Sequence, residues 1–119
     1  MFDSLELLRM AQAYATHAGT RQQAIAQNVA NADTPGYRAR DAIAFDQYYQ
    51  RLSNPVAGGR QDTDAFVRVI ANPASQSPNG NTVSVEQEMM RGAQVRHQHE
   101  LALGVYSMAR DVLRASIGR

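Results

Sequence analysis

Three histidines are the residues of this sequence that could bind a metal or transfer protons near neutral pH. His97 and His99 are two residues apart in a stretch with helical periodicity, where such side chains point to roughly opposite faces and cannot share one ion. His17 is distant from both in the sequence. We therefore expect no metal site and no cofactor.

Two carboxylates, Asp62 and Asp64, flank Thr63 shortly before a possible strand. General acid–base catalysis would require a partner group, but no constellation of His, Lys or Ser accompanies them, so we interpret the segment as a solvated turn. The sequence also lacks a phosphate-binding loop, a nucleophile elbow and a dinucleotide fingerprint. We predict that the protein is not an enzyme.

The overall charge and the missing cysteines exclude further classes of function. All 12 basic residues are Arg, they are scattered along the chain, and they leave a net charge of +1, so nucleic-acid binding is not expected. With no Cys, disulfides and thiolate metal sites are excluded. No apolar run is long enough to span a bilayer, and Asp3 and Glu6 interrupt the N-terminus, which argues against a cleaved signal peptide.

Two long helices are predicted to position the remaining features, over residues 3–31 and 84–117. Asp3 with Glu6, and Ser84 with Gln87, have the spacing of a capping box. Apolar residues recur at the three- and four-residue spacing of helices that pack as a coiled coil. The predicted packing residues are Leu8, Ala11, Ala15, Ala18, Ile25 and Val29 in the first helix, and Leu101, Val105, Met108 and Val112 in the second. A neighbouring apolar track carries Leu103, Tyr106, Leu113 and Ile117.

The expected fold is mainly α, a single domain over residues 1–119 in which the terminal helices pack as an antiparallel coiled-coil-like pair. Turn signals such as Asn54-Pro55, Gly58-Gly59 and Asn72-Pro73 make residues 32–82 an irregular middle, with at most a short strand or hairpin at 66–70 and a short helix or extended arm at 42–52. Glycines inside the predicted helices either are tolerated or mark close approach of another backbone; these are Gly19, Gly92 and Gly104.

The most specific local pattern lies where the first helix ends. Asn31 is of a type that ends helices, and Thr34 is pushed to an extended conformation by the proline after it. Pro35 and Gly36 suit the central positions of a type II turn, which should bring the Tyr37 ring back toward the helix. The pattern therefore predicts a helix stop followed by a tight reversal. The residues of this motif are Asn28, Asn31, Asp33, Thr34, Pro35, Gly36 and Tyr37.

The segment Asn28-Val29-Ala30-Asn31-Ala32-Asp33-Thr34-Pro35-Gly36-Tyr37 resembles the shared signature of the flagellar axial proteins, which form the rod, the hook and the hook–filament junction. Its continuation through Arg38-Ala39-Arg40-Asp41 is most similar to the FlgB-type family of proximal-rod proteins. The segment Asn79-Gly80-Asn81-Thr82-Val83, directly before the second helix, resembles the same family. The resemblance covers residues 1–50 and 79–119.

The resemblance implies a structural subunit of the proximal rod of the bacterial flagellar basal body. Such a subunit would transmit torque, leave the cytoplasm through the flagellar type III apparatus without a cleaved signal peptide, and reside in the periplasmic rod. Its implied partners are copies of itself, neighbouring rod proteins, the MS ring and the export gate. No nucleic acid and no direct membrane insertion are implied.

Two alternatives remain open at this level. Another rod subunit, of the FlgC type, would usually carry a Tyr-x-x-Asn pattern in its C-terminal helix, which this sequence lacks. A cytoplasmic helical adaptor or export chaperone would also have amphipathic ends, but it would be soluble and helical in isolation. A rod subunit should instead be partly disordered alone, or polymerise.

Overall fold

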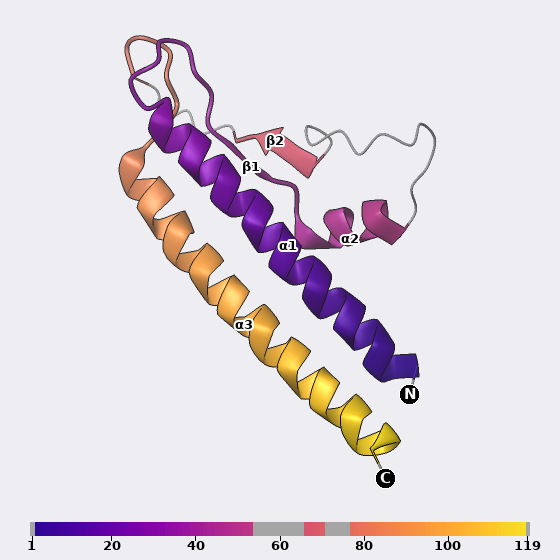
Figure 1. Cartoon of the computed structure of the whole chain (residues 1–119). Coiled ribbons are helices and arrows are strands. Elements are labelled where there is room, and N and C mark those ends of the chain that lie inside the picture. The colour runs from indigo at the N-terminus through magenta and orange to yellow at the C-terminus, as the bar shows by residue number, and fades with distance from the viewer. Residues whose placement is uncertain (1, 54–65, 71–76, 119) are drawn as a thin grey trace.

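The computed structural model describes residues 2–53, 66–70 and 77–118. Two long helices run side by side in opposite directions, with both chain ends at the same end of the pair (Figure 1). This arrangement confirms the predicted antiparallel helical pair. The elements in chain order are α1 (Phe2–Ala30), β1 (Arg40–Ala42), α2 (Phe45–Ser53), β2 (Val67–Val69) and α3 (Val85–Ile117).

The start of α3 is fixed by Ser84, as its spacing from Gln87 predicts. Ser84 has an extended backbone, and its hydroxyl oxygen accepts a hydrogen bond from the Gln87 backbone N–H at 3.4 Å. Glu86 and Glu88 lie in the first turn, where negative charge is favourable because the helix dipole is positive there. Glu88 is buried and forms an ion pair with Arg91 one turn further on.

The core between the two long helices is narrow and built largely from small side chains. Ala18 and Ile25 of α1 form a buried cluster with Val95 of α3, and Ala102 and Ala109 continue the buried face of α3. Small side chains let the two backbones approach closely but bury little apolar area each, so each contact contributes modestly to stability. The pair therefore needs further contacts to fix its register.

The described part of the middle of the chain is more regular than the sequence indicates. β1 pairs antiparallel with β2, with Arg40 opposite Val69 and Ala42 opposite Val67. The predicted strand at 66–70 is thus confirmed over Val67–Val69, and most of the segment at 42–52 belongs to a helix, α2, that begins at Phe45. The predicted turns at 54–55, 58–59 and 72–73, and the carboxylates Asp62 and Asp64, lie outside the described residues.

Aromatic side chains explain why α2 is ordered against α1. The Phe45 ring packs edge-on against Tyr14 of α1, with ring centroids 4.8 Å apart. Tyr48 is buried between His17 and Phe66, at centroid distances of 5.1 and 5.0 Å. Such pairs contribute about 0.5–1.5 kcal/mol each beyond the area they bury. Residues 40–53, from the start of β1 to the end of α2, are called the arm below, and the name here means this folded segment.

The helical glycines do not mark close approach of backbones among the described residues of the chain. A Cβ atom built at Gly19, Gly92 or Gly104 would meet no heavy atom within 4 Å among the described residues, apart from the helix around it. Close approach was one of two interpretations of these glycines, and the described residues of this chain do not provide it.

Candidate assembly site

The turn after α1 has the conformation that its sequence predicts. The Tyr37 backbone N–H donates to the Thr34 carbonyl at 3.2 Å, and Gly36 has a φ of +75°. A positive φ at the third position defines a type II turn and favours glycine. Asn31 supports the helix end through its side chain, which donates to the Gln27 carbonyl and accepts from the Thr34 hydroxyl. Asp33 and Pro35 are exposed.

Asn28 fastens the returning chain to α1. It is 0% exposed, and its amide both donates to the Arg40 carbonyl at 2.7 Å and accepts from the Arg40 N–H at 2.9 Å. The side chain thereby pairs with the Arg40 backbone as a neighbouring strand would. The Tyr37 hydroxyl reaches the same Asn28 oxygen at 3.4 Å, so the ring does turn back toward the helix as predicted.

Asn81 closes the end of α1 from the other half of the chain. It is 1% exposed, and its Nδ2 lies 2.9, 3.0 and 2.7 Å from the carbonyl oxygens of Asn31, Ala32 and Thr34. Its Oδ1 accepts from the Val83 N–H. These carbonyls lie at and just beyond the helix end, where partners within the helix are lacking. The role of Asn81 was not predicted from the sequence.

A second turn meets the first. Ser77 accepts from the Gly80 N–H at 2.9 Å, and Gly80 has a φ of +85°. The Gly36 N–H donates to the Asn79 carbonyl at 3.0 Å, and a Cβ on Gly80 would lie 3.5 Å from the Cα of Gly36. The two loops lie together at the end opposite the chain termini (Figure 1). We call the contacts within and between residues 28–40 and 77–83 the interlock.

Halfway along the pair, a buried polar network joins three elements. His17 Nε2 lies 2.7 Å from the Ile43 carbonyl oxygen, and His17 Nδ1 lies 2.8 Å from Gln98 Nε2. Arg21 donates to Gln98 Oε1 at 3.1 Å and forms an ion pair with Asp41 at 3.3 Å. Burial is the main cause that lowers the pKa of His17 below its ordinary value. The network ties the arm and α3 to the same stretch of α1.

The apolar tracks predicted on α3 do not form its contact with α1. Leu101, Met108 and Val112 are 50, 68 and 56% exposed, and Val105 is half-buried. The three exposed residues therefore do not pack against α1, and a packing role for them stays a prediction about neighbouring subunits. The buried residues of α3 are instead Glu88, Val95, Gln98, Ala102 and Ala109.

Helix geometry places the buried face of α3 between the two predicted tracks. At about 100° per residue, Leu101, Met108 and Val112 lie to one side of Ala109, and Leu103, Tyr106 and Ile117 to the other. The second set is also exposed. Each track therefore forms an open apolar flank on one side of the α1–α3 contact. The small alanines in between carried too weak a signal to be chosen from the sequence.

On α1 the predicted packing residues divide differently. Ala11, Ala18 and Ile25 are buried and Leu8 and Ala15 are half-buried, whereas Val29 is 46% exposed. Near the chain termini, α1 also exposes Leu5, Leu7 and Met10. The open apolar surface of the molecule thus includes parts of both long helices.

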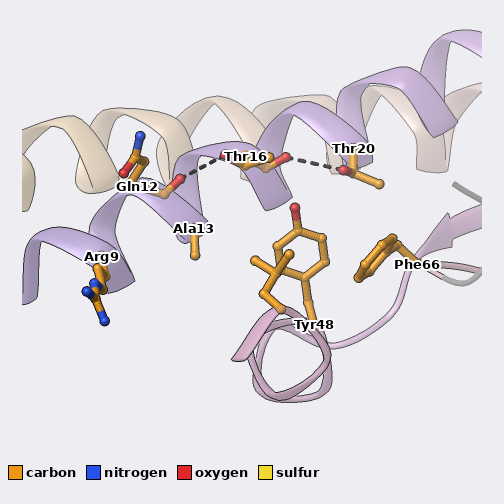
Figure 2. A pocket seen from close by; sticks show the side chains of 8 residues that line it. Arg9, Gln12, Ala13, Thr16, Thr20, Tyr48 and Phe66 are labelled. Carbon is orange, nitrogen blue, oxygen red and sulfur yellow. Dashed lines mark hydrogen bonds between the residues drawn. The ribbon is translucent and has the colours of Figure 1, made fainter. Parts of the chain in front are cut away.

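An open groove of about 430 Å³ lies where the arm packs against α1 (Figure 2). Figure 2 shows the Tyr48 hydroxyl directed toward the α1 segment that carries Thr16 and Thr20. Both threonine hydroxyls bond back to carbonyls of their own helix. Burial raises the pKa of Tyr48. The groove is bounded by Arg9 and Phe66.

In the described part of the chain, no group of three or more His, Cys, Asp or Glu side chains could hold a metal ion. Within the same residues, no helix combines the length and hydropathy needed to cross a bilayer. Both His97 and His99 are exposed on α3.

The end of α1 and the turn after it match a known protein family. A family model described as flagella basal body rod protein matches residues 15–38, which include the second half of α1 and the turn through Tyr37. The second half of α1 and the turn that ends it are thus similar to the flagellar basal body rod proteins.

The particular family follows from relatives that align over most of the chain. Flagellar basal body rod protein FlgB of Yersinia ruckeri is 30% identical over 126 residues, covering 87% of this chain and 89% of the relative. FlgB of Agrobacterium fabrum is 28% identical, with 82% and 81% covered, and FlgB of Bacillus subtilis is 35% identical, with 66% and 67% covered. The chain belongs to the FlgB family of flagellar basal body rod proteins.

Proposed function

We propose that this chain is a structural subunit of the proximal rod, which assembles through α1 and α3, connects the MS ring and export gate to the rest of the rod, and transmits torque. It is exported by the flagellar type III apparatus without a cleaved signal peptide and acts in the periplasmic part of the basal body. Its partners are further copies of itself, neighbouring rod proteins, the MS ring and export-gate components.

The observation that carries this proposal is the pair of open apolar flanks on α3. Apolar side chains such as Met108 at 68% and Ile117 at 71% exposure cost free energy in water, and neighbouring helices would remove them from it. An antiparallel helix pair with apolar flanks on both sides of its own contact can be surrounded by identical pairs. That is the geometry a helical tube requires.

The contact within each subunit supports the same function. Because Ala102 and Ala109 hold α3 against α1 with little apolar area, the larger apolar side chains of α3 stay available for burial against neighbouring subunits. The interlock and the polar network meanwhile fix the register of the two helices. Each subunit would therefore present the same surface to its neighbours, as transmission of torque through a repeated contact requires.

The test places a charge on one flank. In cells whose own copy is deleted, Met108→Glu should leave synthesis and export of the chain intact but prevent rod formation, because a buried, unpaired carboxylate is costly. The readouts are immunoblots of exported protein, electron microscopy of basal bodies, and swimming. The change should alter the stability of the isolated chain by less than about 0.5 kcal/mol, since Met108 is exposed there.

Arg114→Glu is the matched control, because Arg114 is exposed in the same part of α3 and already places a charged side chain there, at the edge of the other flank, so the change buries no new charge. It should be tolerated better than Met108→Glu. Normal rods in the Met108→Glu strain would contradict an assembly role for this flank.

A further inference from the structure

The buried network around His17 is separate from the interlock and from the open flanks. Its position is unusual because three elements meet at one imidazole: α1 supplies His17, the arm supplies the Ile43 carbonyl, and α3 supplies Gln98. Gln98 is one of the buried polar residues of α3, on a face otherwise lined by Val95, Ala102 and Ala109. A polar side chain at that place must be matched by a partner on α1, which fixes how far the helices can slide.

The hydrogen bonds determine where the imidazole carries its proton. The Ile43 carbonyl oxygen can only accept, so His17 Nε2 must be the ring nitrogen that carries hydrogen. Gln98 Oε1 faces Arg21, which can only donate, so the Gln98 amide nitrogen must face His17 Nδ1. The same amide nitrogen also donates to the Tyr14 carbonyl at 3.1 Å. His17 Nδ1 is therefore an acceptor, and the ring is neutral.

A second proton on His17 has no partner in this arrangement. An Nδ1–H would point at the N–H groups of Gln98, and rotation of that amide would place its nitrogen against Arg21 instead. The charged groups that face His17 are Arg21 on α1 and Asp41 on the arm, which form an ion pair and act in opposite directions. Tyr48 of α2 packs on the ring, and α3 contributes the uncharged Gln98.

We propose that the His17–Gln98 contact is a proton-sensitive lock, which holds the arm and α3 in register on α1 while His17 is neutral and is broken when His17 takes up a proton. Mild acid then loosens the middle of the helix pair, while the interlock, which contains no histidine, stays closed. The inference concerns the folded chain itself and does not depend on the proposed function.

The sign of the pH effect follows from the lowered pKa of His17. Because the folded chain binds this proton less readily than the unfolded chain, the stabilisation from the lock is complete above the ordinary histidine pKa of about 6.5 and decreases as the pH falls toward the lowered value. Over that interval the unfolding equilibrium constant should rise by up to about tenfold per pH unit.

Gln98→Glu provides a reversal test in the full-length chain. A carboxylate at position 98 accepts from Arg21 and also from a protonated Nδ1, so it favours the charged ring. The His17 pKa should then rise above its ordinary value, and the contribution of His17 should be present at low pH and lost as the pH rises through that raised pKa. The change in sign separates a lock from a merely structural role.

The measurements are urea unfolding followed by circular dichroism from pH 5 to 8, and NMR titration of the histidine rings. For the unfolding curves, the chain with Gln98 and the Gln98→Glu variant also carry His97→Gln and His99→Gln, which remove the two exposed rings. For NMR, His97 and His99 are kept as internal references. His17→Gln should abolish the pH dependence above about pH 5.5, where carboxylates are already ionised.

The expected result is weaker folding in acid for the natural residue at position 98 and the opposite dependence for Gln98→Glu. The proposal is overturned if both chains respond to pH with the same sign. It is equally overturned if the His17 ring titrates together with His97 and His99, including the case in which the isolated chain does not form the network at all.

Discussion

The two ends of the α1–α3 pair hold the chain together by different chemistry. At the interlock, the buried amides of Asn28 and Asn81 satisfy backbone groups of specific residues, and two glycines with positive φ let the turns meet. At the end with the chain termini, α3 contacts α1 through small residues such as Ala109 and leaves Met108 and Ile117 exposed.

This difference indicates a division of labour. Hydrogen bonds to buried backbone groups are directional, so they determine one path for the chain and penalise every other. Apolar surface is non-directional and can be buried by any complementary neighbour. The interlock therefore defines the subunit, while the other end is available to whatever packs on it.

The largest expected effect is on the interlock, for Asn81→Asp. The Nδ2 of Asn81 lies within 3.0 Å of the carbonyl oxygens of Asn31, Ala32 and Thr34, and a carboxylate there would oppose three acceptors with no proton to share. We expect a loss of about 3 kcal/mol in the free energy of unfolding. Urea denaturation of the full chain at pH 8 measures it.

Asn79→Asp is the matched control, because it makes the same chemical change two residues earlier. Asn79 is exposed and uses its Oδ1 as an acceptor for the Asn81 N–H, a role that aspartate retains. Its effect should be within about 0.5 kcal/mol. Equal losses for the two variants would show that the carbonyl contacts of Asn81 are unimportant.

A smaller loss is expected for Gly36→Val. A Cβ on Gly36 would meet no atom within 4 Å among the described residues, so the cost arises from the φ of +75°, and is about 1–3 kcal/mol. Basal bodies from cells with this variant should lack rods although the chain is exported, because every copy would repeat the misdirected turn.

Tyr37→Phe is the milder change at the same turn and should retain most motility, since the hydroxyl contact to Asn28 is long, at 3.4 Å. Similar motility in the two strains would count against this account of the turn.

The same comparison explains which features were predictable from the sequence. The turn was predicted because Pro35-Gly36 is a local signal, and the start of α3 because the Ser84 cap is local too. The capping box predicted for Asp3 and Glu6 is wrong, because α1 begins at Phe2 and Asp3 lies inside its first turn. Asn28 was placed in the motif, but its pairing with Arg40 depends on how the chain returns. Asn81 acts on Asn31, 50 residues earlier in the chain, and Gln98 acts on His17, 81 residues earlier. No local sequence pattern contains such partners.

The face of α3 that contacts α1 was missed for a different physical reason. Hydrophobic periodicity identifies large apolar residues, and here these flank the contact while alanines form it. In a subunit that packs on several neighbours, the strongest apolar tracks need not mark the contact within the chain. The order of the arm was likewise underestimated, because it depends on long-range ring contacts such as Tyr14 with Phe45.

The smallest expected effect, and the one of opposite sign, is for Gly104→Ala at the open end. Gly104 is exposed in the interior of α3, and the Cβ would meet no other atom within 4 Å among the described residues. Alanine should therefore stabilise the isolated chain by up to about 1 kcal/mol through helix propensity and the reduced freedom of the unfolded chain. Gly19→Ala on α1, also exposed, is the control and should stabilise by a similar amount. The informative readout is rod assembly, because a neighbouring backbone packed closely on Gly104 would leave no room for the added methyl group. If both variants swim normally, neither glycine marks a close contact between subunits; loss of rods for Gly104→Ala alone, in a chain that has become more stable, would place a subunit contact at that point of α3.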